Sequence, residues 1–98
     1  MTTDVSSRDY GPYFCALSYP EQLAVIRYLD KLAKHYPELA AQATAGPGFD
    51  GEVYVRAPLP TEDELLIPLE KAAIRITSKI LLDTGVSILL MPEPKQDQ

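Results

Sequence analysis

The sequence predicts an α/β domain in which N-terminal helices precede a β-α-β unit, with an α+β arrangement as the alternative. Three observations carry this prediction. Residues 52–57 alternate polar and apolar, residues 61–85 follow a helical pattern, and residues 86–91 form an apolar run closed by Pro92. Because a long connection returns the chain to the same end of a sheet, the two strands should lie parallel with a right-handed crossover.

Length and composition predict one domain flanked by two polar tails. The chain has 98 residues, of which 46% are hydrophobic, and this size leaves no room for a second core. We place the domain at residues 10–92. Residues 1–9 and 93–98 hold few groups to bury and are expected to be disordered.

The net charge and the cysteine content indicate which classes of partner are disfavoured and which cellular compartment is expected. With 14 acidic and 9 basic residues the net charge is -5, which disfavours nucleic acid and anionic membranes as partners. The single cysteine, Cys15, cannot form an intrachain disulfide, and the first nine residues have no signal-peptide pattern. These features predict a cytoplasmic protein, and no motif calls for a cofactor.

In the N-terminal half, two helices should follow an aromatic segment. Residues 13–17 suit either a helical turn or a third strand. Ser18 and Glu21 have capping-box spacing, so a helix should begin there. It should end or kink at Tyr36, before Pro37, which can open a shorter helix through residue 45. The expected core stripe of the first helix is Leu23, Ile26, Leu29, Leu32 or Ala33, and Tyr36.

The long helix should start at a second capping box, Thr61 with Glu64, and Pro68 predicts a kink or a break near Ile67. A projection at roughly 100° per residue gathers its sheet-facing side chains into one sector. These are Leu65, Leu69, Ala72, Ala73, Ile76 and Ile80.

A second apolar row on this helix is the main functional signal. Ile67, Ile74 and Leu81 recur every seven residues and fall outside the sheet-facing sector, beyond Glu70 and Thr77. A surface helix of a lone small domain rarely carries two apolar stripes. Either the first helix covers this row within the chain, or a second copy covers it in a dimer.

The sheet also looks incomplete from the sequence. The strand at residues 86–91 has apolar side chains on both faces and should be central. The strand at residues 52–57, with Glu52, Tyr54 and Arg56 on one side, should be the edge or a half-exposed member. Two strands do not stand alone in water, so a further strand should come from residues 13–17 or from a symmetry mate.

Two single residues have ordinary structural explanations. His35, the only histidine, lies near a helix end, where its cation would suit the helix dipole. Cys15 sits among aromatic residues without a neighbouring base, which predicts a buried, inert thiol.

Asp50 and Glu52 are the candidate metal ligands, because alternate carboxylates leading into a strand would share one face. A glycine-rich loop before such acids, followed by a helix and an apolar strand, is loosely similar to the nucleotidyltransferase arrangement. Gly46-Pro47-Gly48 stands where that family has Gly-Ser, and residues 86–91 lack the third carboxylate. The resemblance therefore implies an inactive relative, with Asp50 and Glu52 as the metal or nucleotide site.

The preferred hypothesis is a non-enzymatic protein-protein interaction module, regulatory or for assembly, that forms a homodimer. Ile67, Ile74 and Leu81 are the expected interface residues. The nucleotidyltransferase-like domain is the alternative.

Overall fold

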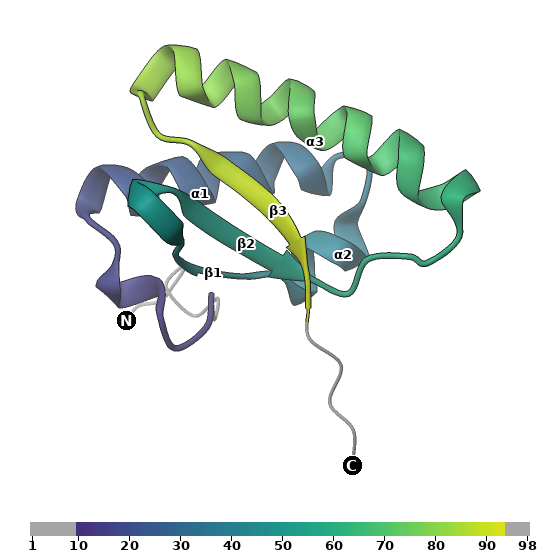
Figure 1. Cartoon of the computed structure of the whole chain (residues 1–98), viewed down its shortest axis with the longest axis horizontal. Coiled ribbons are helices and arrows are strands. Elements are labelled where there is room, and N and C mark those ends of the chain that lie inside the picture. Colours follow the sequence, from purple (N-terminus) through teal and green to yellow (C-terminus); the bar gives the residue numbers. More distant parts are fainter. Residues whose placement is uncertain (1–9, 94–98) are drawn as a thin grey trace, which may run out of the picture.

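A computed structural model describes residues 10–93; the predicted tails, residues 1–9 and 93–98, lie outside this range except for Glu93. Figure 1 shows helices and a small sheet, as the sequence predicts. In chain order the elements are the 3-10 turn η2 (Phe14–Ala16), α1 (Tyr19–Ala33), α2 (Pro37–Gln42), β1 (Thr44–Pro47), the 3-10 turn η3 (Phe49–Gly51), β2 (Val53–Ala57), α3 (Asp63–Thr84) and β3 (Ile88–Pro92).

The sheet has three strands in the order β1-β2-β3. β1 runs antiparallel to β2, with Ala45 opposite Val55, and β3 runs parallel to β2, with Val55 opposite Leu90. The β2-α3-β3 unit is thus the predicted β-α-β unit. Parallel pairing follows because the 22 residues of α3 carry the chain back to the end of the sheet where β2 begins.

Two predicted strand positions are wrong, the central one for residues 86–91 and the edge one for residues 52–57. The half-exposed alternative for residues 52–57 is confirmed, because Tyr54 and Arg56 are half-buried between buried residues of β2. β2 is central and β3 lies at the edge, because the third strand is β1 rather than residues 13–17 or a strand of a symmetry mate. The shorter helix stops at Gln42, and the extended Ala43 leads directly into β1, so that helix does not reach residue 45. Residues 14–16 form η2, which lies against β1, while the Ala45 N-H donates to the Tyr10 carbonyl at 2.8 Å.

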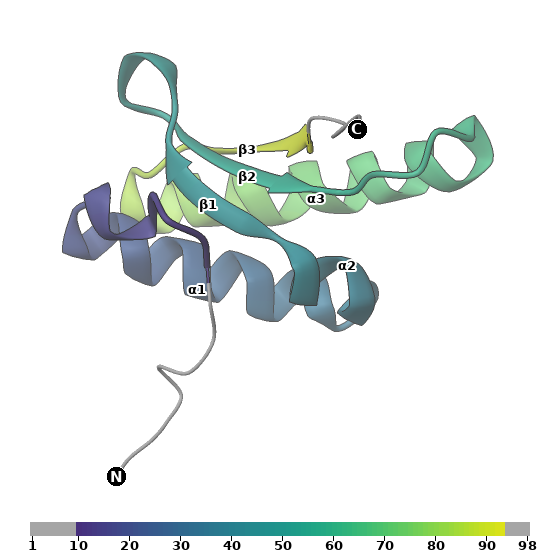
Figure 2. The same ribbon diagram turned by 90° about the horizontal axis from the view of Figure 1, so that it is seen from below.

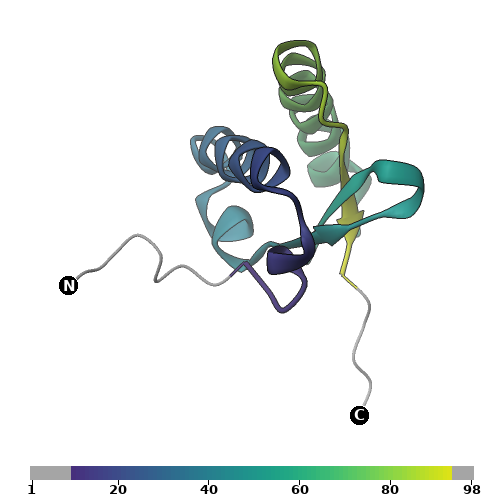
Figure 3. The same cartoon turned by 90° about the vertical axis from the view of Figure 1, so that its left-hand side faces the viewer.

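Both long helices cover the same face of the sheet, side by side (Figures 2 and 3). The core lies between them and the strands. Its fully buried large side chains are Tyr28, Leu32, Leu69, Ile80, Ile88, Val25, Val53 and Val55. Burial of this apolar layer is the main stabilising contribution to the fold.

The start of α1 agrees with the predicted capping box. The Ser18 N-H donates to Glu21 Oε1 at 2.8 Å, and the Glu21 N-H donates to Ser18 Oγ at 3.3 Å. The predicted stripe is only partly right: Leu29 and Leu32 are buried, whereas Leu23 is exposed. The other buried residues of α1 are Ala24, Val25 and Tyr28.

Two details of α3 differ from the prediction. The N-cap is Glu62 and makes no side-chain capping bond, so the Thr61-Glu64 capping box does not form. Of the two outcomes predicted near Ile67, a kink or a break, the break is wrong, because the helix continues through Pro68. It ends at Gly85, whose left-handed φ of 79° suits glycine and whose N-H donates to the Leu81 carbonyl at 2.8 Å.

Replacing Pro68 by alanine should raise the free energy of unfolding by about 1 to 3 kcal/mol. Proline in a helix interior lacks the N-H that would bond four residues back, here to the Glu64 carbonyl, and its ring crowds the preceding turn. Urea unfolding monitored by circular dichroism measures the change. Pro58→Ala, in the loop after β2, is the matched control and should gain less than Pro68→Ala. A loss of stability in Pro68→Ala would mean that the proline ring packs against the chain better than the restored helix hydrogen bond stabilises it.

Candidate interaction surface on α3 and β3

The second apolar row of α3 is exposed to solvent. Ile67, Ile74 and Leu81 are 49%, 64% and 43% exposed, while Leu69 and Ile80 on the sheet-facing side are 1% and 0% exposed. The helix therefore carries two apolar surfaces, and only one is buried within residues 10–93. We call Ile67, Ile74 and Leu81 the outer row.

The first helix does not cover the outer row. α1 packs beside α3, and the Arg27 guanidinium contacts the Asp83 carboxylate at 2.5 Å. At about 100° per residue, Asp83 projects from α3 on the flank opposite Leu81 and Ile74, with the buried Ile80 between the two flanks. Both side chains of the ion pair are more than one third exposed, so the pair contributes little to stability.

A groove runs between the outer-row side of α3 and β3. It has a volume of about 350 Å³ and a mostly apolar lining. Its lining residues are Leu59, Glu70, Ala73, Ile74, Thr77, Ile88, Leu89 and Leu90. The outer-row residue Ile74 thus lines one side of the groove, and the edge strand β3 lines the other side.

Thr77 connects the two sides of the groove. Its hydroxyl donates to the Ile88 carbonyl at 2.9 Å, which joins α3 to β3. Glu70, two helical turns before Thr77, is exposed and is the one acidic residue of the lining. The groove therefore combines apolar walls with one acidic group.

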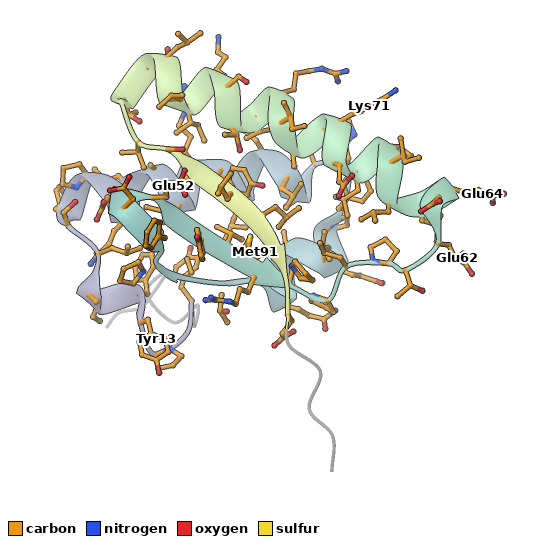
Figure 4. All side chains as sticks on the ribbon, in the orientation of Figure 1. Tyr13, Glu52, Glu62, Glu64, Lys71 and Met91 are labelled. Carbon is orange, nitrogen blue, oxygen red and sulfur yellow. The ribbon has the colours of Figure 1, made fainter. Side chains whose placement is uncertain are left out.

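The face of the sheet opposite the helices is less completely covered. Leu89 is 38% exposed and Met91, labelled in Figure 4, is half-buried. On β2 the Arg56 guanidinium lies 5.5 Å from the centre of the Tyr54 ring. The Tyr10 and Phe14 rings stack at 4.6 Å, and Phe14 packs against the core.

Asp50 and Glu52 lie in the connection between β1 and β2, at the end of the sheet (Figure 2; Glu52 is labelled in Figure 4). Both precede the first residue of β2, so they do not share a strand face as the sequence suggested. Asp50 is exposed and has a left-handed φ of 60°, while the Glu52 N-H bonds to the Phe49 carbonyl at 3.2 Å. Within residues 10–93, no group of three or more metal-binding side chains includes them.

His35 and Cys15 both lie at the surface. His35 borders a shallow hollow of about 210 Å³ together with Lys31, Lys34 and Arg75. Cys15 is exposed, so the expectation of a buried thiol is wrong. In η2 the neighbouring Phe14 turns toward the core, and this leaves Cys15 on the solvent side.

The acidic residues at the start of α3 project away from the domain. Glu62 and Glu64 are exposed and extend from the first turn of the helix (Figure 4). Glu64, together with Asp63, places negative charge at the positive end of the helix dipole, which is sufficient to explain these residues.

Sequence reasoning found the outer row but missed the groove beneath it. The heptad spacing of three apolar residues can be read from the sequence, whereas the groove depends on β3 being an edge strand. In the part of the chain that the structure describes, no helix is both long enough and apolar enough to cross a bilayer. Searches against protein-family models, curated proteins and solved structures gave no match to this chain.

Proposed function

We propose that this protein is a non-enzymatic interaction module, regulatory or for assembly, that forms a homodimer through the outer row of α3. The observation that carries the proposal is the exposure of Ile67, Ile74 and Leu81 on a helix whose other apolar face is already buried. A row of large apolar side chains along an ordered helix is typical of a surface that a partner covers.

The spacing of the outer row suits a second copy of the same helix. With Ile74 at a two-fold axis, antiparallel helices would place Ile74 against Ile74 and Ile67 against Leu81 of the other copy, because both lie seven residues from Ile74. The same alignment places Glu70 opposite Ser78 and Lys71 opposite Thr77. Each outer-row residue then meets an outer-row residue of the other copy, and no like charges meet.

Replacing Ile74 by aspartate should convert the dimer to a monomer. The carboxylate would lie unpaired at the centre of the interface, and desolvating it costs several kcal/mol. The dissociation constant of the dimer should therefore rise at least about 100-fold relative to that of the unmodified chain. Light scattering after gel filtration gives the mass, which should fall from twice the chain mass of 10.8 kDa to the chain mass itself.

The matched control is Leu82→Asp. Leu82 is 86% exposed on the same helix but lies outside the outer row, so this variant adds the same charge and should remain dimeric. Circular dichroism confirms that both variants are folded. Equal masses for folded Ile74→Asp and the unmodified chain would rule out the outer row as the dimer interface.

A further inference from the structure

The outer edge of β3 presents backbone groups that face away from the sheet. The Val53 N-H donates to the Ser87 carbonyl and the Glu93 N-H donates to the Ala57 carbonyl, each at 2.9 Å. Because backbone groups alternate in direction along a strand, those of Ile88 and Leu90 point to the side opposite β2. β2 is the neighbour of β3 in the sheet, so no other strand of residues 10–93 pairs with this edge.

One of these outward groups already has a partner. The Thr77 hydroxyl donates to the Ile88 carbonyl, so the Ile88 N-H and both backbone groups of Leu90 remain for another strand. A donor and an acceptor on the same residue, Leu90, form a pair that an extended chain matches with its own N-H and carbonyl.

α3 lies over β3, next to this edge. Figure 3 shows α1 and α3 side by side on one face of the sheet, with α3 above β3. The groove opens between α3 and β3, and Ala73, Ile74 and Thr77 of α3 face the edge strand across it. A strand added beside β3 would therefore direct every second side chain beneath α3, into an apolar hollow of about 350 Å³.

We propose that the groove binds an extended segment of a partner protein, which adds a fourth strand along β3. The segment carries apolar side chains at alternate positions, to fill the groove, and a lysine or arginine where it passes Glu70. It also needs an N-H at the residue that donates to the Leu90 carbonyl, which excludes proline there. This binding site goes beyond the homodimer and does not depend on it.

A second copy of β3 is the competing occupant of this edge. A two-fold axis normal to the sheet would pair β3 with β3 and place the second α3 beside the first on the same face. The Glu70 carboxylate in the groove favours a segment that brings a lysine or arginine, and β3 itself has no basic residue. Ile74 belongs to both the outer row and the groove lining, so the homodimer contact and the added strand share this side chain. A dimer mass together with no enrichment from either peptide library would assign the edge to a second copy.

The test uses a displayed library of twelve-residue peptides in which alternate positions are restricted to Val, Ile, Leu, Phe and Tyr. A second library places the same residues at helical three and four spacing. The full chain should enrich binders from the alternating library and few from the helical one. Enrichment from the helical library alone, or from neither, would overturn the proposal.

Leu90→Pro, compared with Leu90→Ala, tests the backbone pairing. Both substitutions shorten the side chain, but only proline removes the outward N-H, and the bonds between β2 and β3 do not use that group. Selected peptides should bind Leu90→Pro at least about tenfold more weakly than Leu90→Ala, and peptide should slow hydrogen exchange of the Leu90 amide in the unmodified chain. Equal affinity for the two variants would contradict strand addition.

A peptide modification keeps the test valid if Leu90→Pro does not fold. Peptides are methylated at one backbone nitrogen at a time. Methylation of the residue whose N-H donates to the Leu90 carbonyl should weaken binding at least about tenfold relative to methylation of its neighbour, whose N-H faces away. Light scattering of Leu90→Ala with and without peptide reports dimerisation separately, so failure of either proposal can be recognised without the other.

Discussion

Replacing Ile80 by alanine is expected to lower the free energy of unfolding by about 4 kcal/mol. Ile80 is 0% exposed and lies on the sheet-facing side of α3, among the largest fully buried side chains. Truncation removes its buried methyl and methylene groups and leaves a cavity that neighbouring side chains fill only in part, and such changes cost about 2 to 5 kcal/mol. Since small domains have about 5 to 15 kcal/mol of stability, this is a large share.

The control for this prediction is Leu82→Ala on the same helix. Leu82 is 86% exposed, and exposed substitutions usually change stability by less than about 0.5 kcal/mol. Urea unfolding at a fixed protein concentration compares the two variants, so that dimerisation affects both equally. Similar losses in the two variants would contradict the placement of the buried face of α3.

The second large effect is a loss of stability at alkaline pH that depends on Tyr28. The Tyr28 side chain is 0% exposed, and its hydroxyl has no hydrogen-bond partner within residues 10–93. Burial raises the pKa of Tyr28 to about 12 from its ordinary value of 10.0, and the nearby Thr77 side chain opposes part of this shift. The ionised phenolate therefore favours the unfolded chain.

The sign follows from this raised pKa. Below pH 10 the phenol is neutral in both states and its contribution to stability is complete; as the pH rises from about 10 to about 12, the unfolded chain ionises first and that contribution is lost. A shift of about 2 pKa units corresponds to about 3 kcal/mol. Tyr28→Phe removes this component of the pH dependence and, by removing an unpaired buried hydroxyl, should leave stability at pH 7 unchanged or about 1 kcal/mol higher.

Denaturant unfolding between pH 7 and pH 11.5 measures this effect as the difference between the unmodified chain and Tyr28→Phe. Taking the difference cancels the titration of the five other tyrosines, which both proteins share. Above pH 10 the free energy of unfolding of the unmodified chain should fall relative to that of Tyr28→Phe. Parallel curves over the whole range would show that Tyr28 ionises as easily in the folded as in the unfolded protein.

Local signals in the sequence identified most of the elements. The Ser18-Glu21 spacing places the start of α1 correctly, because a capping box depends only on residues three apart. The alternation of polar and apolar residues identified β2, and the length and helical periodicity of the apolar pattern identified α3. The same local reasoning failed at Thr61, where Glu62 rather than Thr61 became the N-cap.

The arrangement of the sheet could not be read from local signals. β1 contains only Thr-Ala-Gly-Pro, and glycine and proline are uncommon in strands, so nothing in these four residues indicates a strand. Its pairing with β2 makes β2 central and leaves β3 at the edge. The groove beneath α3 follows from that tertiary arrangement, whereas the outer row was visible as a simple heptad spacing.

The mass of the full chain in solution tests the central claim most directly, because the outer row is proposed to be covered by a second copy. Light scattering should be recorded from micromolar to millimolar protein. We predict that the mass rises to, and stays at, twice the chain mass of 10.8 kDa. A mass of 10.8 kDa at every concentration would contradict the account.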